Sequence, residues 1–198
     1  MIVGLTGGIG SGKSFIAQEL SKHGFVIYDC DREAKRIIAE NKDVQTAITD
    51  LLGEEAFVDG KYNTAYVVKR VFEDSKLLEG LNKIVHPAVV KDIRDSKDPK
   101  DTLIVESAIL FQAGLAPLCD KIVVVTAPED VRIARTIARD YQGAATPENI
   151  NKVRARIHAQ KEIPASTEVP QGKILTVVND DASILSCIID RICRFTAG

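Results

Sequence analysis

The feature that most constrains this chain is a glycine-rich segment near its start, Gly7-Gly8-Ile9-Gly10-Ser11-Gly12-Lys13-Ser14. A short apolar run precedes it at residues 2–5, and an apolar pattern with helical spacing follows it at residues 15–20. This is the strand–loop–helix context that the G-x-x-x-x-G-K-[ST] motif requires. Glycines let backbone N–H groups turn inward around phosphate oxygens, and the start of the helix adds positive charge. The segment therefore predicts a phosphate-binding loop (P-loop) for a nucleoside triphosphate.

Individual residues of this loop predict distinct contacts with the nucleotide. Lys13 is expected to reach the β- and γ-phosphates, which also makes it a candidate catalytic residue, and the Ser14 hydroxyl is expected to ligate Mg²⁺. The expected nucleotide-binding residues form one continuous stretch of the chain: Gly8, Ile9, Gly10, Ser11, Gly12, Lys13, Ser14 and Phe15.

Apolar runs of strand length alternate with helical patterns along the chain. Strands are expected at residues 1–6, 25–29, 102–106, 121–126 and 174–178. Helices are expected at residues 13–22, 31–41, 43–53, 64–72, 74–97, 128–140, 147–162 and 181–195. Strands separated by helices indicate an α/β protein of the P-loop NTPase type, with a parallel five-stranded sheet and helices on both faces.

One long insertion interrupts this alternation. About seventy residues separate the second and third expected strands, far more than one crossover helix needs, and their pattern is helical. The sequence therefore predicts a single P-loop kinase domain over residues 1–198, with a helical acceptor lobe at about residues 31–100. Its core is expected to comprise residues 1–30, 101–140 and 171–198.

A second interruption lies at residues 141–147, where small residues connect two helical stretches that carry arginines. Such a composition is typical of a mobile lid, expected here at about residues 139–165. The arginines next to it suit phosphate oxygens, which a closing lid would bring them to meet. Among them Arg139 is nearest to the connection and is the preferred candidate; the others are Arg132, Arg135, Arg154 and Arg156. A P-loop core with an acceptor lobe and a lid is the architecture of small-molecule kinases.

Acidic residues at the carboxyl ends of the expected strands are the candidates for proton transfer and metal binding. Asp29 and Asp31 follow the second strand, and alternation along an extended segment would put both carboxylates on the same side. A carboxylate there would orient an acceptor hydroxyl and take its proton, a role for which Asp31 is favoured. Asp29 is equally suited to cap the next helix. Glu106 ends the third strand and is either a second-sphere metal residue or a solvated strand-end charge.

Composition excludes several other classes of protein. A net charge of −2 offers no basic surface for nucleic acid, and 45% hydrophobic residues are ordinary for a globular protein. No apolar run approaches the ~18 residues of a membrane span, and the start shows no secretory signal. The four cysteines lack a C-x-x-C pairing and are expected to be reduced thiols in a cytoplasmic protein. The expected assembly is a monomer or a small homo-oligomer.

Further motifs, taken together with the P-loop, resemble those of the dephospho-coenzyme A kinase family across nearly the whole chain. They are Asp29-x-Asp31, Asp59-Gly60, Leu81-x-x-Ile84-Val85-His86-Pro87, Arg135-x-x-x-Arg139-Asp140, Arg156-Ile157-x-x-Gln160 and Asn179 after the last strand. The resemblance implies a cytoplasmic enzyme that transfers the γ-phosphoryl group of ATP to the ribose 3′-hydroxyl of dephospho-coenzyme A. This is the last step of coenzyme A biosynthesis.

The resemblance also implies roles for individual residues. Asp31 corresponds to the family's catalytic base, and Arg139 to the lid arginine that meets the ATP phosphates. Asn179 is implied as an ATP contact, and Asp29 and His86 as contacts of the acceptor. Taken without the resemblance, a lone histidine such as His86 is more often a packing or capping residue.

The chain departs from the usual family pattern at several positions. Phe15 replaces a common Thr, Asn63 replaces a frequent Arg, and Gln112 stands where a Glu is frequent. The usual Ala-Asp before the last strand is missing, with Gly172 near that place.

Two other functions stay open at the level of the residues. One is a P-loop kinase for another nucleotide or a small alcohol, but a monophosphate kinase needs arginines in the acceptor lobe, and residues 54–96 contain only Arg70 and Arg94. The other is a nucleotide-dependent switch protein, for which the N-K-x-D motif of guanine recognition is missing.

Overall fold

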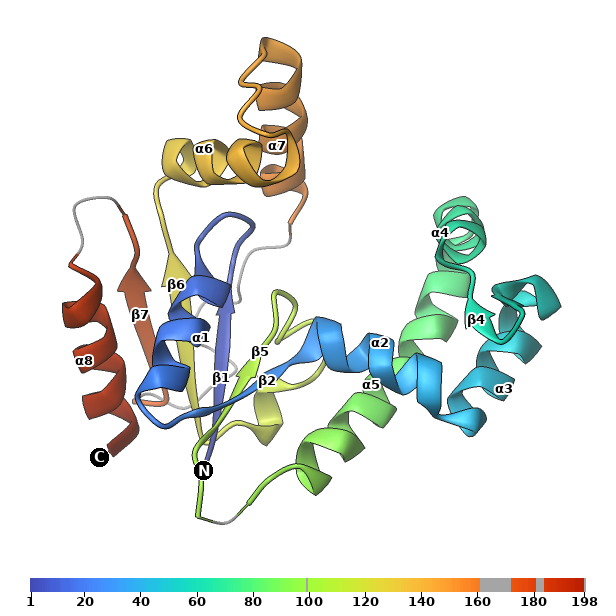
Figure 1. Cartoon of the computed structure of the whole chain (residues 1–198), viewed down its shortest axis with the longest axis horizontal. Coiled ribbons are helices and arrows are strands. Elements are labelled where there is room, and N and C mark those ends of the chain that lie inside the picture. Colours follow the sequence, from blue (N-terminus) through green and yellow to red (C-terminus); the bar gives the residue numbers. More distant parts are fainter. Residues whose placement is uncertain (99, 161–171, 181–183, 198) are drawn as a thin grey trace. The chain divides into compact units, whose positions relative to one another are not determined.

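The computed structural model describes residues 1–98, 100–160, 172–180 and 184–197 (Figure 1). The chain divides into two compact units. The first comprises Met1–Tyr28 and Asp98–Gly198, and the second comprises Asp29–Lys97.

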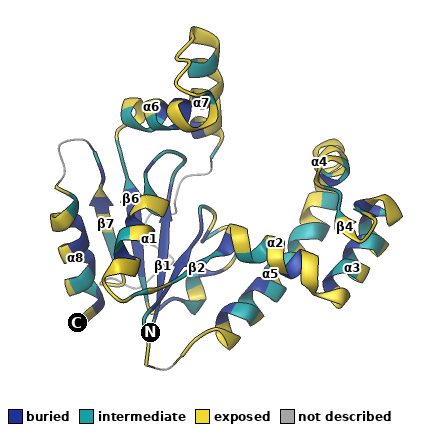
Figure 2. Cartoon of the chain, in the orientation of Figure 1, coloured by how far each residue is buried: buried dark blue, intermediate teal, exposed yellow. Residues whose placement is uncertain are grey.

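A five-stranded sheet forms the centre of the first unit (Figure 1). Its strand order is β2 (Val26–Asp29), β5 (Leu103–Glu106), β1 (Ile2–Gly7), β6 (Lys121–Thr126) and β7 (Ile174–Val178). β1 pairs in parallel with β5 and β6, and β6 pairs in parallel with β7. The five strands expected from sequence are confirmed to within one residue at each end. β1 and β5 are buried throughout and β6 is buried between its ends, whereas the edge strands β2 and β7 are partly exposed (Figure 2).

The two faces of the sheet are covered differently. Helices α1 (Lys13–Lys22) and α8 (Leu185–Ala197) pack on one face, where Val3 and Leu5 of β1 are completely buried among their apolar side chains. On the opposite face lies the segment after β5, which carries the 3-10 helix η2 (Ala116–Leu118). It approaches so closely that a Cβ at Gly4 would lie 2.8 Å from Cδ2 of Leu110. Glycine in the middle of β1 therefore allows this close packing.

Helices α6 (Glu129–Asp140) and α7 (Pro147–Ala159) follow the carboxyl end of β6, and the segment expected as a lid, about residues 139–165, starts at the end of α6 and includes α7. They pack on each other through a small apolar cluster of Ile133, Ile137, Val153 and Ile157. The turn between them is ordered by hydrogen bonds, since Thr146 Oγ1 accepts from the Asn149 N–H at 3.2 Å and caps α7. Residues 161–165 of the expected lid lie outside the described residues.

The second unit consists mainly of four helices, α2 (Cys30–Glu40), α3 (Lys42–Leu52), α4 (Thr64–Glu73) and α5 (Ser75–Asp95). Each begins with an Asp or Asn whose side chain accepts hydrogen bonds from the first turn: Asp29, Asn41, Asn63 and Asp74. Such caps satisfy backbone N–H groups that have no partner within the helix. The departure at Asn63 thus has a structural role, because its Oδ1 accepts from the Tyr66 N–H at 3.2 Å.

A short hairpin between α3 and α4 was not expected from the periodicity. A 3-10 helix, η1 (Glu54–Ala56), leads into strand β3 (Phe57–Val58), which pairs antiparallel with β4 (Lys61–Tyr62). Asp59 and Gly60 form the turn, with φ of 50° and 72°. Two positive φ values in a two-residue turn are typical of type I′ hairpins, for which Asp-Gly is a preferred sequence.

Helix α5 is 21 residues long and contains Pro87 in its interior. Within the described ranges, no helix combines the length and apolar composition that crossing a membrane requires.

Candidate functional site

The P-loop connects β1 to α1, and its backbone is shaped for glycine. Gly12 has φ of 85° and precedes the first helical residue, Lys13; no described side chain caps this helix. A Cβ at Gly12 would lie 2.3 Å from Nδ2 of Asn179, and one at Gly10 (φ 76°) would lie 2.4 Å from the Arg132 carbonyl oxygen. Side chains at either position would therefore clash as well as strain the backbone. The first N–H groups of α1 remain available to an anion.

An open pocket of about 160 Å³ lies over this loop. It is lined by Gly10, by residues 12–15, and by Arg135, Thr136 and Arg139 of α6. Lys13, Ser14 and Arg139, three of the expected nucleotide contacts, therefore come together in one pocket. Arg135 and Thr136 join them; the three arginines of α6 were recognised from sequence, but Arg139 alone was preferred. The shared helical face of Arg135 and Arg139, one turn apart, is the signal that could have added Arg135.

The Ser14 hydroxyl donates a hydrogen bond of 2.5 Å to Oε1 of Glu106. Glu106 is the last residue of β5 and is only 8% exposed. It is therefore not a solvated strand-end charge. A hydroxyl and a carboxylate beside a phosphate site suit Mg²⁺, which takes oxygen ligands and is usually held by one or two protein groups, phosphates and water. In the described part of the chain, no cluster of three or more His, Cys, Asp or Glu residues forms a metal cage of protein side chains.

Asn179 lies beneath the loop rather than in the pocket lining. It is 8% exposed, and its Nδ2 donates to the Ser11 carbonyl at 2.9 Å. The backbone carbonyl oxygen of Asn179 accepts a hydrogen bond from Arg135 Nη1 at 2.8 Å. Ser11 is also buried, and its hydroxyl has no hydrogen-bond partner among the described residues. Asn179 therefore ties the end of β7, the P-loop and α6 together.

Replacing Asn179 by Ala tests this support. The variant leaves the buried Ser11 carbonyl without its donor, for which we expect a loss of about 1–3 kcal/mol in the free energy of unfolding. Urea unfolding measures it. Asn149→Ala is the matched control, because its Nδ2 donates to the Ala144 carbonyl at 2.8 Å in an exposed position. Equal losses in the two variants would contradict the role of burial at Asn179.

The tip of the loop is bonded to α6 and to the residue that follows α7. The Ile9 N–H donates to Oε1 of Gln160, which follows α7, and the Ile9 carbonyl accepts from Nε of Arg132, both at 2.8 Å. The Ile9 side chain packs against the apolar cluster between α6 and α7. Burial lowers the pKa of Arg132. Ile9, which the sequence predicts as a nucleotide contact, also connects the P-loop to α6 and to the residue after α7. Gln160 was recognised by family resemblance alone.

Arg139 is oriented by its neighbours on the lid. Its Nε donates to Oδ1 of Asp140 at 2.7 Å, and Arg156 Nη1 donates to Oδ2 of the same carboxylate at 2.9 Å. The hydrogen bond from Arg139, and to a lesser extent that from Arg156, lowers the pKa of Asp140 to about 2. The same bond to Asp140 raises the pKa of Arg139. The Arg139 side chain is 64% exposed. A charged guanidinium that is both exposed and oriented is available to an anion in the pocket.

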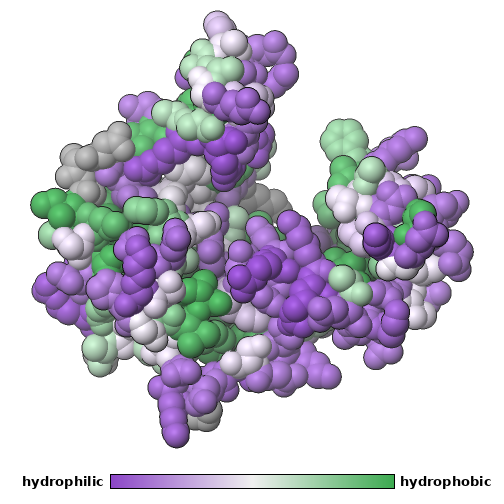
Figure 3. Space-filling view, in the orientation of Figure 1, coloured by the Kyte–Doolittle hydropathy of each residue, from purple (hydrophilic) through white to green (hydrophobic). Residues whose placement is uncertain are grey.

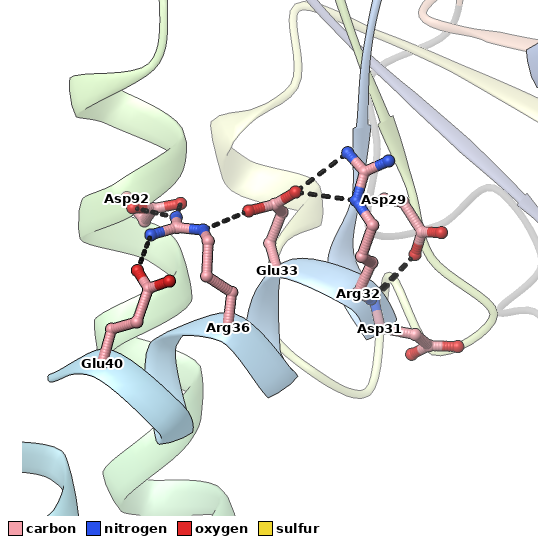
Figure 4. A network of polar contacts seen from close by, with 7 residues as sticks. All are labelled: Asp29, Asp31, Arg32, Glu33, Arg36, Glu40 and Asp92. Carbon is pink, nitrogen blue, oxygen red and sulfur yellow. Dashed lines mark hydrogen bonds and ion pairs between the residues drawn. The ribbon is translucent and has the colours of Figure 1, made fainter.

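In the second unit, the extended backbone that was expected through Asp29 and Asp31 is wrong. The alternation argument fails because the chain becomes helical at Cys30, so Asp31 lies in the first turn of α2. Asp29 is the helix cap: its Oδ1 accepts from the N–H groups of Asp31 and Arg32 at 3.0 and 3.1 Å (Figure 4). The Asp31 carboxylate is exposed and bonds to no described residue.

A network of ion pairs fixes α2 against α5 (Figure 4). Arg36 Nη2 contacts Asp92 of α5 at 2.7 Å, and its other nitrogens contact Glu33 and Glu40 of α2. The bond to Glu33, followed by those to Asp92 and Glu40, raises the pKa of Arg36. The bond to Arg36 lowers the pKa of Glu33. The visible surface of α2 is accordingly hydrophilic in Figure 3. The network sets the orientation of the helix whose first turn carries Asp31.

His86 lies within α5, directly before Pro87. It is partly buried, and burial lowers its pKa below 6.5. Because the unfolded chain then binds a proton more readily than the folded one, stability is expected to fall as pH drops below 6.5 toward the folded pKa. Urea unfolding at pH 7 and pH 5.5 should show this fall, and His86→Gln should reduce it. The exposed His23→Gln variant is the control; an unchanged pH dependence in His86→Gln would contradict this assignment.

Comparison with known proteins adds independent information. The dephospho-CoA kinase family model matches residues 1–181. A dephospho-CoA kinase of Porphyromonas gingivalis is 39% identical over 146 residues, covering 73% of this chain and 72% of the relative. One of Fusobacterium nucleatum is 32% identical over 198 residues, covering 98% and 97%. A crystal structure from Thermus thermophilus, TT1252, superposes with a TM-score of 0.74 at 28% identity, covering 100% and 96%. The chain belongs to the dephospho-CoA kinase family.

Proposed function

We propose that the P-loop pocket binds Mg²⁺-ATP and that Asp31 is the base that activates the acceptor. The reaction itself follows from the family: ATP phosphorylates dephospho-coenzyme A to give coenzyme A and ADP. The observation that carries the proposal is the match of this family over residues 1–181, together with a P-loop pocket that contains Lys13, Ser14 and Arg139.

The donor side of the reaction is served by the first unit. Backbone N–H groups at the start of α1 would bind phosphate oxygens, and Lys13 would neutralise charge on the β- and γ-phosphates. Ser14, with Glu106 behind it, would hold Mg²⁺, which would supply positive charge against the phosphate groups. Arg139 and Arg135 line the same pocket and would stabilise the negative charge of the transition state.

The acceptor side is assigned to the second unit. The ribose 3′-oxygen of dephospho-coenzyme A attacks the γ-phosphorus, its proton passes to the Asp31 carboxylate, and the bond from the γ-phosphorus to the leaving ADP oxygen breaks. Asp29 would contribute by fixing the first turn of α2 through its two cap hydrogen bonds. His86 is proposed beside the acceptor because of the family resemblance; its lowered pKa keeps the imidazole neutral near pH 7.

The proposal extends to the setting of the enzyme. A diffusible acceptor and donor suit a cytoplasmic enzyme with no need of a nucleic acid or membrane partner, acting as a monomer or small homo-oligomer.

Identification of the product tests this proposal. Purified protein is incubated with Mg²⁺-ATP and dephospho-coenzyme A, and the product is analysed by ³¹P NMR and mass spectrometry. We expect a new 3′-phosphomonoester with the mass and retention of coenzyme A. A phosphate at another position of the acceptor, or release of inorganic phosphate without any product, would contradict it.

A further inference from the structure

Phe15 is the third residue of α1, directly after Ser14, and its position is not explained by packing. The core-facing side of this helix is made by Ile16, Ala17 and Leu20, which are all buried. Phe15 is instead 50% exposed. Exposing a large aromatic side chain gives up the free energy of its burial, so an unfilled contact surface remains here.

Phe15, with its exposed side chain, is one of the residues that line the P-loop pocket. The other lining residues are two glycines, which have no side chain, and five polar or charged residues: Gly10, Gly12, Lys13, Ser14, Thr136, Arg135 and Arg139. Phe15 is therefore the sole aromatic side chain among the described lining residues. Every other group there suits phosphate oxygens or the metal, and the ring does not.

ATP has the same division of chemistry. Its triphosphate is matched by lysine, arginine and backbone N–H groups, whereas its base is flat, aromatic and weakly hydrated on its faces. We propose that the Phe15 ring packs against the nucleoside of the donor nucleotide and serves as its stacking surface. This inference rests on the proposed function, since it takes the pocket to be the ATP site.

A stacking surface of this kind has a consequence for specificity. A phenyl ring carries no hydrogen-bond donor or acceptor, and every nucleobase has a π-face on which it can stack. Phe15 therefore contributes affinity for the nucleoside without choosing between adenine and guanine. Its removal is expected to weaken binding of ATP and GTP by the same factor.

Binding of three ligands separates this role from a role in the phosphate loop. Isothermal titration calorimetry with Mg²⁺ compares ATP, GTP and inorganic tripolyphosphate in wild-type protein, Phe15→Ala and Phe15→Trp. Alanine favours the helix and removes only the ring. We expect Phe15→Ala to weaken ATP and GTP by roughly 5-fold to 150-fold, the scale of losing one aromatic stack, and to leave tripolyphosphate unchanged. Phe15→Trp should retain ATP affinity.

Two results would overturn the role of Phe15. Equal weakening of ATP and tripolyphosphate would mean that the ring acts through the loop, and unchanged ATP binding would mean that it does not touch the nucleoside. Failure of the proposed function looks different: wild-type protein would then bind neither ATP nor tripolyphosphate, which would remove the ATP site and the role of Phe15 with it.

Discussion

Substitution of Lys13 by Ala is expected to reduce turnover by about 10³-fold and to raise the dissociation constant of ATP by about 10-fold to 100-fold. Lys13 lines the pocket at the first position of α1, where its ammonium group would meet the β- and γ-phosphates. Charge develops there during transfer, so the effect on the transition state exceeds the effect on binding. Steady-state kinetics and calorimetry with Mg²⁺-ATP measure the two effects.

Lys22→Ala is the matched control for this variant. It removes the same charge from the last turn of the same helix, where the ammonium group is exposed and pairs with Glu19 at 2.6 Å. Loss of such an exposed pair typically costs less than about 1 kcal/mol. Turnover should stay near the wild-type value. Normal kinetics in Lys13→Ala would contradict the assignment of the pocket.

Substitution of Asp31 by Asn is expected to lower kcat by at least about 10²-fold, the usual scale for loss of a general base. The KM for ATP should hardly change, because Asp31 belongs to the acceptor side of the proposal. The amide keeps the size of the side chain but does not accept a proton from the ribose hydroxyl.

Helix α3, the next helix along the chain, has an aspartate at the position that corresponds to Asp31 in α2. Asp43 lies in the first turn of α3, and the cap residue Asn41 accepts from its N–H at 3.0 Å, as Asp29 does from Asp31. Asp43→Asn therefore removes the same first-turn charge, worth about 0.3–1 kcal/mol to the helix, without touching the proposed base. A kcat near wild type in Asp31→Asn, or an equal loss in both variants, would remove Asp31 from the role of base.

The regular elements of this fold could be predicted from the sequence because buried strands and helices have characteristic patterns of apolar residues. The continuous β-branched run Ile122-Val123-Val124-Val125 is completely or almost completely buried in β6. The expected helix at residues 13–22 matches α1, whose apolar positions repeat with helical spacing. The hairpin around Asp59 and Gly60 was not predicted, because strands of two residues are too short to show an alternating pattern of apolar and polar residues. Its Asp-Gly turn was the available signal.

The local geometry around Asp31 shows where a strand-based argument fails. Alternation of side chains requires an extended backbone through residue 31. Asp29 instead caps a helix that begins at Cys30. The preference of Asp for this position was recognised as an alternative, and it is the one that the hydrogen bonds support. The two aspartates are therefore a helix cap and a residue of the first helical turn, not alternating residues of one strand.

The candidate site likewise has a part that the sequence predicts and a part that it does not. The P-loop is contiguous in sequence, so its motif alone predicts the phosphate cradle. The supports of the loop come from far along the chain: Asn179 reaches Ser11 across 168 positions, and Gln160 reaches Ile9 across 151. No local pattern encodes such pairs, because they depend on how β7 and the lid helices pack on the loop. They are apparent only once the elements are placed.

The most direct test of the whole account is ADP release with Mg²⁺-ATP against a panel of acceptors: dephospho-coenzyme A, adenosine, nucleoside monophosphates, shikimate and gluconate. The account predicts strong stimulation by dephospho-coenzyme A alone, with coenzyme A as the product. Stimulation by a different acceptor, with none by dephospho-coenzyme A, would contradict it.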